Sequence, residues 1–236
     1  MKDLLGQAAL DYLRGALRQN PVTETQITEA DEFEVKYLFR SYGHMPEIEK
    51  WALDHACGSI LDAGCGAGSH ALELQNRGFD VTAIDISNNF IETCRLRGVK
   101  NARVADIMKI EEKFDTILLL MNGTGICGRL SGLADFLDHL RNMLAKDGQI
   151  LIDSSDIIYM FEQEDGSFEV PAEGFYGELI FELSYDGQTE DPFPWLYVPF
   201  ELLREVAHSV GLACDKALDG PHYDYLARLY AIKKPG

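Results

Sequence analysis

The residues with the clearest chemical meaning lie between positions 59 and 70. An apolar run ends at the acid Asp62, and three glycines follow at every second position, namely Gly64, Gly66 and Gly68. Glycines in this spacing allow backbone dihedrals closed to other residues and leave no side chain between the turn and a ligand. A helical pattern starts directly afterwards, and the first N–H groups of a helix have no intrahelical partner. We therefore predict a strand, a tight turn and a helix start that hold part of a small molecule.

The spacing of the glycines argues against a dinucleotide. In the fingerprint G-x-G-x-x-G, the third glycine lies three residues after the second, which brings the pyrophosphate to the helix N-terminus. Here that position is Ser69, and the third glycine comes one residue early, at Gly68. The carboxylate of Asp62 would also repel a pyrophosphate, whereas it would attract an ammonium group. The turn therefore favours a ligand other than a nicotinamide dinucleotide.

The same segment resembles motif I of the class I S-adenosylmethionine (SAM)-dependent methyltransferases, D/E-x-G-x-G-x-G, read here as Asp62-Ala63-Gly64-Cys65-Gly66-Ala67-Gly68. The strings at 120–123 and 153–156 look like those of a bacterial branch acting on small molecules. The resemblance covers about residues 58–234 and implies that SAM is the methyl donor. It also implies that the glycines let the backbone pass the methionyl part, and that Asp62 supports its ammonium directly or through water.

A polar group follows each further predicted strand, and the resemblance implies a role for most of them. These groups are Asp85, Asp106, Asn122 and the acids of 153–156. Ligands of an open α/β sheet bind outside the carboxyl ends of its parallel strands, so the recurrence predicts a single site. A carboxylate only accepts hydrogen bonds, and the position of Asp85 is implied to bind both ribose hydroxyls.

The remaining cofactor contacts are likewise implied by the resemblance. Ile86 would lie against the adenine, whose amino group Asp106 would bind while the backbone N–H of Ile107 meets the ring. Met121 and Asn122 lie where a main-chain carbonyl holds the ammonium in this family. For Asp106, a simple helix cap is the alternative interpretation.

The substrate side is predicted from topology. If the last strand is reversed, its start lies at the same sheet edge as the cofactor, together with the segment that leaves after Asp156. We expect the start of that strand to bring His222, Tyr223 and Tyr225 to the pocket. The segment after Asp156 is expected to add an aromatic wall, formed by Tyr159, Phe175, Tyr176, Trp195 and Tyr197. His222 is the preferred general base because an unperturbed imidazole titrates near neutrality, with Asp156 second and His70 third. A solvated turn histidine, or a reaction that needs no base, is the alternative.

Charge and composition limit the classes of molecule that the protein is expected to bind. The formal net charge is −18, and no Lys or Arg occurs between Lys146 and Arg204, where acids abound. Such a surface repels nucleic acids and anionic membranes, so we expect neither as a partner but a neutral or cationic small molecule. The five scattered cysteines form no C-x-x-C and favour reduced thiols rather than a metal site. Without a long apolar run or a signal-like N-terminus, we expect a cytoplasmic protein.

Hydrophobic periodicity predicts the elements that position these residues. Helices are expected over 1–18, 28–43 (with Thr28 as N-cap), 45–56, 69–77, 87–98, 133–144 and 201–210. Strands are expected over 59–62, 81–84, 102–104, 114–120, 149–152, 212–218 and 225–232, with a hairpin over 177–198. Apolar strands that alternate with helices indicate a parallel sheet covered on both faces.

The predicted fold is therefore α/β, a doubly wound, seven-stranded, mostly parallel sheet with a reversed last strand. We assign residues 1–57 to N-terminal helices that pack over the cofactor as a lid, and 58–156 to a Rossmann-like SAM-binding core. Residues 157–198 form an acidic hairpin insertion after the fifth strand, which is a substrate lid or a partner contact and offers a route to a homodimer. Residues 199–236 complete the core.

The predicted function is methyl transfer from SAM to an unidentified small molecule. Aminopropyl transfer on the same fold is an alternative, although its usual paired acids are missing after the fourth strand, which reads Asn122-Gly123. A cofactor-binding partner subunit without catalysis is the non-enzymatic alternative. The glycine spacing opposes a nicotinamide oxidoreductase.

Overall fold

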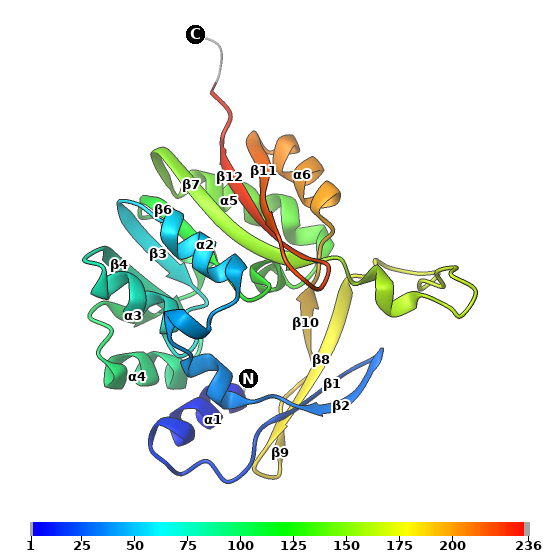
Figure 1. Cartoon of the computed structure of the whole chain (residues 1–236), viewed down its shortest axis with the longest axis horizontal. Coiled ribbons are helices and arrows are strands. Elements are labelled where there is room, and N and C mark those ends of the chain that lie inside the picture. Colours follow the sequence, from blue (N-terminus) through cyan, green and yellow to red (C-terminus); the bar gives the residue numbers. More distant parts are fainter. Residues whose placement is uncertain (1, 234–236) are drawn as a thin grey trace. The chain divides into compact units, whose positions relative to one another are not determined.

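A computed structural model describes residues 2–233. The chain divides into two compact units: unit 1 comprises Met1–Ile110 and Ile180–Phe193, and unit 2 comprises Glu111–Leu179 and Pro194–Gly236. Figure 1 shows the chain with its elements labelled.

A seven-stranded sheet has the strand order β11-β12-β7-β6-β3-β4-β5. Its strands are β3 (Ser59–Ala63), β4 (Asp80–Asp85), β5 (Ala102–Val104), β6 (Phe114–Leu119), β7 (Leu144–Ser155), β11 (Leu212–Asp219) and β12 (Asp224–Ala231). The pairs β3–β4, β4–β5 and β6–β7 are parallel, whereas β12 is antiparallel to both β7 and β11. The predicted α/β fold with a seven-stranded, mostly parallel sheet and a reversed last strand is confirmed.

The sheet part of unit 1 follows the predicted alternation of strand and helix. In Figure 1, α3 (Ser69–Asn76) and α4 (Asn88–Arg97) lie beside β3 and β4. Ile60 and Leu61 of β3 are fully buried, as are Leu74 of α3 and Ile91 of α4. Ser87 caps α4 as expected, because its Oγ accepts a hydrogen bond from Phe90 N at 2.9 Å. Burial of β3 on both faces explains why the neighbouring residues Ile60 and Leu61 are both apolar.

The N-terminal part of unit 1 is only partly helical, which corrects the prediction. Helix α1 (Leu4–Leu13) ends before residue 18 because Gly15 adopts φ +70°, a left-handed conformation that terminates helices. The stretch predicted as a helix over 28–43 instead contains the strand β2 (Thr28–Glu32). Two short 3-10 turns, η1 (Val35–Phe39) and η2 (Tyr42–His44), and the expected helix α2 (Glu47–His55) follow.

Strand pairing explains why Thr28 does not cap a helix. It pairs with Thr25 at the end of β1 (Val22–Thr25), and the two hydroxyl oxygens lie 2.8 Å apart. On its other edge, β1 pairs antiparallel with β8 (Glu178–Tyr185), where Thr23 faces Leu183. A partner strand more than 150 residues away in sequence thus overrides the local helical pattern. The predicted turn of the hairpin at Asp186 and Gly187 is present, and β9 (Gln188–Thr189) returns along β8.

Unit 2 contains the strands β6, β7, β11 and β12 of the seven-stranded sheet and its own apolar core. Helices α5 (Leu133–Asn142) and α6 (Phe200–Ser209) accompany these strands, and the short strand β10 (Phe193–Leu196) precedes α6. Ile117, Leu118 and Leu119 of β6 and Leu137 of α5 are fully buried. Strand β7 begins at Leu144, five residues before the predicted start at residue 149. The register with β6 shifts between Phe114, which pairs with Leu144, and Thr116, which pairs with Gln149. The residues predicted as a turn therefore lie within the strand.

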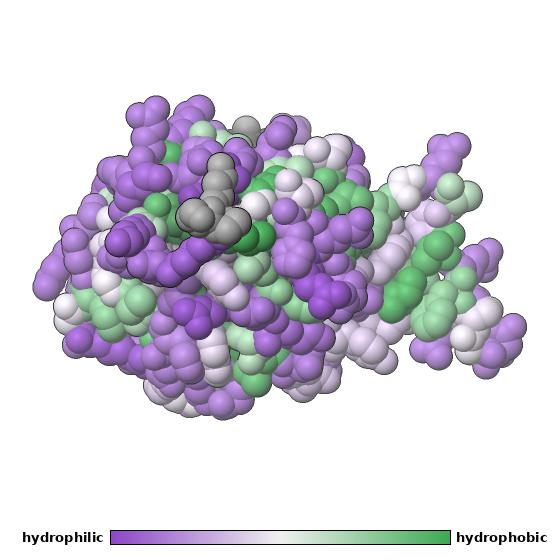
Figure 2. Space-filling view, turned by 90° about the horizontal axis from the view of Figure 1, so that it is seen from above, coloured by the Kyte–Doolittle hydropathy of each residue, from purple (hydrophilic) through white to green (hydrophobic). Residues whose placement is uncertain are grey.

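Hydrophilic residues predominate on the face seen in Figure 2. Hydrophobic side chains gather on the segment that follows β7 in unit 2, at the right of Figures 1 and 2, where Met160, Phe168 and Val170 are exposed. Within the described residues, no helix combines the length and the apolar character needed to cross a membrane.

Candidate functional site

The glycine loop of unit 1 has the strained backbone that its sequence predicts. Gly64, Gly66 and Gly68 have φ angles of +70°, +51° and +83°, a region that favours glycine. A Cβ at Gly66 would meet no atom within 4 Å, whereas one at Gly68 would lie 2.8 Å from Cys94 Sγ. The loop is therefore open at Gly66 and closely packed against α4 at Gly68.

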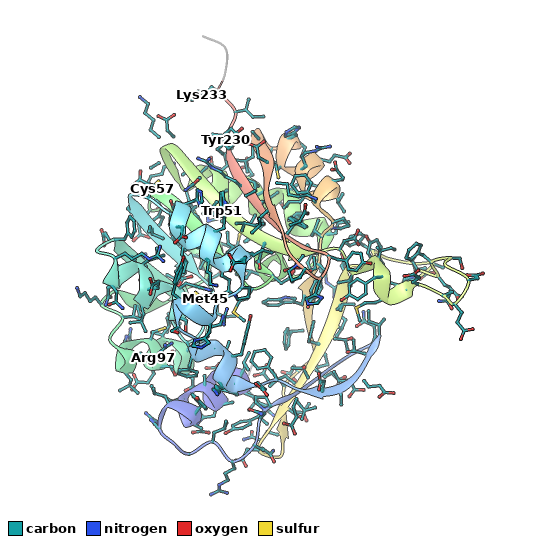
Figure 3. All side chains as sticks on the ribbon, viewed as in Figure 1. Met45, Trp51, Cys57, Arg97, Tyr230 and Lys233 are labelled. Carbon is teal, nitrogen blue, oxygen red and sulfur yellow. The ribbon has the colours of Figure 1, made fainter. Side chains whose placement is uncertain are left out.

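Arg97, the last residue of α4, supports this loop and was not among the predicted site residues. Its guanidinium Nη1 donates to the carbonyl of Ala67, and the same nitrogen lies 3.2 Å from Ser69 Oγ. Its ring contact with Phe39 fixes the guanidinium from the other side, with 4.8 Å between Cζ and the ring centroid. Figure 3 labels Arg97. Because an arginine near a helix end is commonplace, this role has no signal in the sequence.

Asp85, at the end of β4, is fixed in front of the loop. Its Oδ2 accepts a hydrogen bond from Gly66 N at 3.0 Å, and its Oδ1 accepts one from Ser87 N at 2.9 Å. Burial raises the pKa of Asp85 to about 6, although both backbone N–H groups oppose this shift. The side chain is thus a preorganised carboxyl group whose charge is costly in the free protein.

Asp62 lies beneath the loop and is 2 % exposed. Its Oδ2 is buried without a hydrogen-bond partner. Burial raises the pKa of this carboxyl, while His70 and the backbone N–H of Ala71 oppose the rise. A buried polar atom without a partner is costly and marks a place where a bound group can compensate.

His70, the third candidate base, belongs to a buried ion network of unit 1 instead. Its Nε2 lies 2.9 Å from Glu49 Oε2, and Arg40 donates from Nε to the same carboxylate at 3.0 Å. Burial raises the pKa of Glu49, but His70 and Arg40 outweigh it and hold that pKa below its usual range. His70 and Arg40 therefore bind Glu49 rather than stand free.

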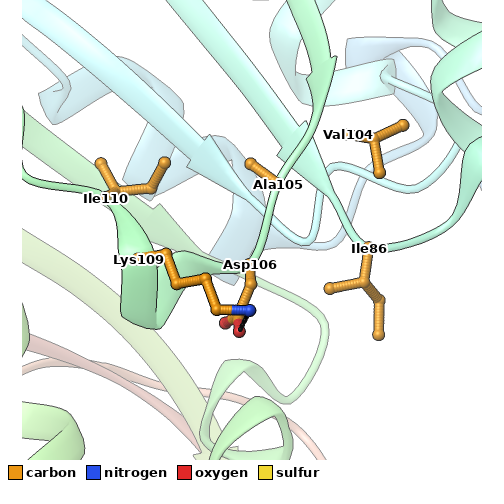
Figure 4. Close-up of a pocket in the computed structure, with 6 residues that line it drawn as sticks. All are labelled: Ile86, Val104, Ala105, Asp106, Lys109 and Ile110. Atoms are coloured by element: carbon orange, nitrogen blue, oxygen red, sulfur yellow. Dashed lines mark ion pairs between the residues drawn. The ribbon is translucent and has the colours of Figure 1, made fainter.

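A pocket of about 450 Å³ lies where β4 and β5 end (Figure 4). It is lined by Ile86, Val104, Ala105, Asp106, Lys109 and Ile110. Ile86 is 62 % exposed, so a large apolar side chain faces this space without cover. Asp106 accepts from Met108 N at 3.0 Å, and Lys109 Nζ lies 3.3 Å from its carboxylate.

The structure thus brings Ile86 and Asp106 together, and it adds Lys109 to them. Ile107, by contrast, is a core residue whose side chain is 6 % exposed and does not line the pocket. The cap interpretation of Asp106 also holds, because the same carboxylate begins the short turn η3 (Ile107–Lys109).

In unit 2, the turn after β6 has an unusual backbone. Met121 and Asn122 both have positive φ angles, +69° and +60°. Asp153 stabilises this conformation, since its carboxylate accepts from Met121 N at 3.1 Å and from Gly123 N at 2.8 Å. The side chain of Asn122 is used internally, between Leu196 O at 3.2 Å and Ser154 Oγ at 3.1 Å. Backbone groups, not side chains, are therefore what this turn offers to a ligand.

Three of the five predicted substrate residues, Tyr159, Tyr176 and Tyr223, lie together with the candidate base Asp156 at the end of β7. Tyr176 donates its hydroxyl to Asp156 Oδ1 at 2.8 Å, and Asp156 N donates to Tyr223 O at 3.0 Å. Tyr223 stacks on Tyr159 with 4.9 Å between ring centroids. Tyr223 is 62 % exposed and has φ +60°, a conformation that is strained for a bulky residue. His222 is exposed beside it, and its backbone N donates to Asp224 Oδ1 at 2.8 Å.

The other two predicted substrate residues, Tyr225 and Trp195, lie elsewhere in unit 2. Tyr225 is 3 % exposed and donates its hydroxyl to Val198 O at 2.6 Å, so it has a structural bond in the core. Trp195 packs against the turn η4 (Gly123–Cys127), where a Cβ at Gly125 would lie 2.0 Å from the indole. Only glycine at position 125 leaves room for the indole of Trp195. Sequence spacing alone does not reveal this packing contact.

Comparison with known proteins identifies the chain. Residues 60–148 match the family described as methyltransferase domain. The crystal structure of a SAM-dependent methyltransferase from Bacteroides fragilis, in complex with S-adenosyl-L-homocysteine, has 43% sequence identity and a TM-score of 0.92. The match covers 98% of this chain and 96% of that one. The chain belongs to the SAM-dependent methyltransferases.

More distant structures share the fold of this methyltransferase. The CcbJ methyltransferase from Streptomyces caelestis has 15% identity and a TM-score of 0.63, over 80% of this chain and 91% of that one. The sugar N-methyltransferase KedS8 from Streptoalloteichus has 15% identity and a TM-score of 0.59, over 87% and 96%. No curated protein sequence matches significantly. The predicted enzyme class, fold and cofactor are confirmed, and the acceptor is not identified by these matches.

Proposed function

We propose that the unit 1 residues at the ends of β3, β4 and β5 hold SAM, and that the acceptor of this methyltransferase is a neutral or cationic small molecule. The observation that carries the first part is Asp85. Its two oxygens are fixed by Gly66 N at 3.0 Å and Ser87 N at 2.9 Å, one residue before the exposed Ile86. A rigid acceptor-only group beside an open apolar pocket suits a ribose joined to a base.

The residues of unit 1 fit the cofactor on three further observations. The loop is open at Gly66, the pocket at Ile86 and Asp106 has room for a planar base, and the buried Oδ2 of Asp62 has no partner. Asp85 would bind the ribose hydroxyls and Ile86 the adenine face. Asp106 and the backbone of Ile107 would bind the adenine edge.

The ammonium of the cofactor is assigned to Asp62 of unit 1. Because Asp62 is 2 % exposed, a water molecule between carboxylate and ammonium suits it better than direct contact. When bound, SAM supplies a methyl group already activated by its sulphonium, so the chain mainly aligns the reactants and excludes water.

For the acceptor we propose the cluster of Asp156, Tyr159, Tyr176 and Tyr223. The chain between Lys146 and Arg204 has no basic residue, which disfavours an anionic acceptor. His222 is the preferred base because it is exposed beside Tyr223. Asp156 is less suited, since its carboxylate already accepts from Tyr176 and from Ile158 N. Tyr225 is better explained by its bond in the core.

Calorimetry tests the cofactor assignment. S-adenosylhomocysteine should bind the wild type, NAD should not, and Asp85→Ala should lose about 30- to 100-fold in affinity, the value of one or two charge-assisted hydrogen bonds. Asp80→Ala is the matched control, because Asp80 is an exposed acid at the opposite end of the same strand. Equal affinities of both variants would refute the role of Asp85.

A methylation screen over neutral, cationic and anionic metabolites then tests the acceptor. Turnover of amines or alcohols, but not of phosphates or nucleic acids, is expected. Full turnover in His222→Ala with normal cofactor binding would remove His222 as the base. Aminopropyl transfer predicts product only with the decarboxylated cofactor, and a partner subunit predicts binding without any product. Homodimerisation through the hairpin and a cytoplasmic location stay predictions.

A further inference from the structure

Two thiols meet directly beneath the glycine loop. Cys65 lies within the loop and Cys94 on α4, and their Sγ atoms are 3.7 Å apart. Both are free, and they are 6 % and 0 % exposed. Neither the fold nor the proposed chemistry requires two cysteines in contact, because any pair of small apolar residues would fill the same space.

Both cysteines are coupled to the backbone that passes the cofactor site. Cys94 Sγ lies 3.2 Å from the carbonyl of Gly66, to which its S–H donates, and it limits position 68 to glycine. Gly66 in turn donates its N–H to Asp85. A displacement of either sulfur therefore changes the peptide groups on both sides of Gly66 and the hydrogen bond that orients Asp85.

We propose that Cys65 and Cys94 are a site of reversible oxidation, and that the disulfide between them weakens cofactor binding. A disulfide bond is about 2.05 Å long, so the sulfurs must approach by roughly 1.7 Å. Closure pulls Cys65 toward α4 and removes the S–H donor of Cys94 from Gly66 O. The effect on cofactor affinity rests on the proposed function of the loop, whereas formation of the disulfide does not.

The oxidant required is a hydroperoxide. Cys65 is the attacking residue because it is the less buried of the two. Its sulfur attacks the peroxide oxygen, the O–O bond breaks, and a sulfenic acid and water form. The sulfur of Cys94 then attacks the sulfur of the sulfenic acid, the S–O bond breaks, and a second water leaves. Two thiols and one hydrogen peroxide thus give one disulfide and two waters, and a dithiol reverses the change.

The surroundings predict a slow reaction that depends on pH. The hydrogen bond to Cys94 and burial raise the pKa of the Cys65 thiol, and the nearby Asp62 and Asp85 raise it further. Because the thiolate is the reactive species, oxidation should accelerate as the pH rises from 7 to 9. By linkage, a cofactor that binds the reduced loop more tightly also shifts the dithiol–disulfide equilibrium toward the reduced form.

The test treats the reduced, full-length protein with hydrogen peroxide and maps its peptides without reduction. We expect a peptide linked through Cys65 and Cys94, a mass lower by about 2 Da, and an affinity for S-adenosylhomocysteine lower by at least about tenfold, all reversed by dithiothreitol. S-adenosylhomocysteine should protect against the linkage. Cys94→Ser should form no linkage and lose no further affinity on oxidation.

Cys57→Ser is the matched control, because Cys57 is exposed and lies outside the loop (Figure 3). This variant should respond to peroxide as the wild type does. If peroxide oxidises Cys57 of the wild type but produces no peptide linked through Cys65 and Cys94, the proposed disulfide is refuted. A linked protein with unchanged affinity would overturn the coupling to cofactor binding. If the reduced protein itself does not bind S-adenosylhomocysteine, the proposed function fails, while the peptide map still decides the disulfide.

Discussion

Protonation of Asp85 should control how tightly the methyltransferase binds its cofactor. Burial raises the pKa of this carboxyl to about 6 in the free protein. Ribose hydroxyls donate hydrogen bonds to the ionised form, so binding favours the carboxylate and lowers its pKa. If only the ionised form binds, the apparent Kd is unchanged at pH 8, about doubled at pH 6 and raised about tenfold at pH 5. This tenfold difference corresponds to about 1.4 kcal/mol.

Asp85→Asn isolates this effect. The amide keeps an oxygen that can accept from one of the two N–H groups, but it carries no charge at any pH. We expect weaker binding of S-adenosylhomocysteine at pH 8 by about 10- to 100-fold, because charge-assisted hydrogen bonds become neutral ones. The tenfold weakening between pH 8 and pH 5 should disappear from the variant. A pH dependence that remains would belong to Asp62, whose pKa burial also raises.

Rising pH should lower the stability of the free protein, whereas it strengthens cofactor binding. The folded-state pKa of Asp85 lies above its unfolded value, so this group stabilises the fold at low pH, and that stabilisation is lost as the pH rises from about 4 to about 6. A shift of about two pKa units corresponds to about 3 kcal/mol. Asp85→Asn removes this loss at neutral pH but weakens a hydrogen bond from Gly66 or Ser87 by about 1 kcal/mol.

The assay combines titration calorimetry at pH 5, 6, 7 and 8 at constant ionic strength with urea unfolding of the free protein. The expected result is weaker binding together with equal or higher stability at pH 8. Unchanged affinity in Asp85→Asn, or the same tenfold pH dependence in both proteins, would refute the reasoning. A large loss of stability at pH 8 would instead show that the two N–H bonds outweigh the cost of burying the charge.

Three further substitutions test the organisation of unit 2. Asp153→Ala removes the acceptor of two backbone N–H bonds in the turn after β6; we expect a free energy of unfolding lower by about 2–4 kcal/mol, and an unchanged urea midpoint would contradict this role. Gly125→Ala places a methyl group 2.0 Å from Trp195, which should cost about 1–3 kcal/mol in thermal unfolding and change the indole fluorescence. Tyr225→Phe removes the hydrogen bond to Val198 O and should lower stability by about 1–2 kcal/mol with the KM of the acceptor unchanged; a raised KM at full stability would return Tyr225 to the substrate site.

The glycine loop and the strand ends were predictable because their signals are local. Gly64, Gly66 and Gly68 need positive φ angles that few other residues adopt, so their spacing reports the backbone directly. Asp85 and Asp106 follow short apolar runs, and the parallel sheet brings such positions to one edge. The reversed last strand was equally accessible, since a short connection between β11 and β12 forces an antiparallel pair.

The features that the sequence did not predict depend on residues far away in the chain. Residues 28–32 carry a plausible helix cap at Thr28, yet β1 and β2 form because β8 supplies the pairing edge. Arg97 supports the glycine loop from the end of α4, and no spacing rule connects it to Ala67. His70 looked available for proton transfer, but Glu49 of α2 binds it in the interior. In each case, a contact between residues far apart in the sequence decided the structure, whereas the prediction depended on a local pattern.

Asp62 and Asp85, the two carboxylates beside the glycine loop, are costly to bury in the free protein, and cofactor binding offers a reason for this cost. Asp62 and Asp85 are both mostly buried, burial raises the pKa of each, and Asp62 has an oxygen without any partner. Replacing either by its amide should therefore not destabilise the free protein as a core substitution does. A ligand that brings an ammonium and ribose hydroxyls compensates the buried charge, so part of the binding free energy is stored in the free protein as electrostatic strain. Wild type should consequently gain more thermal stability from saturating S-adenosylhomocysteine than Asp62→Asn or Asp85→Asn does.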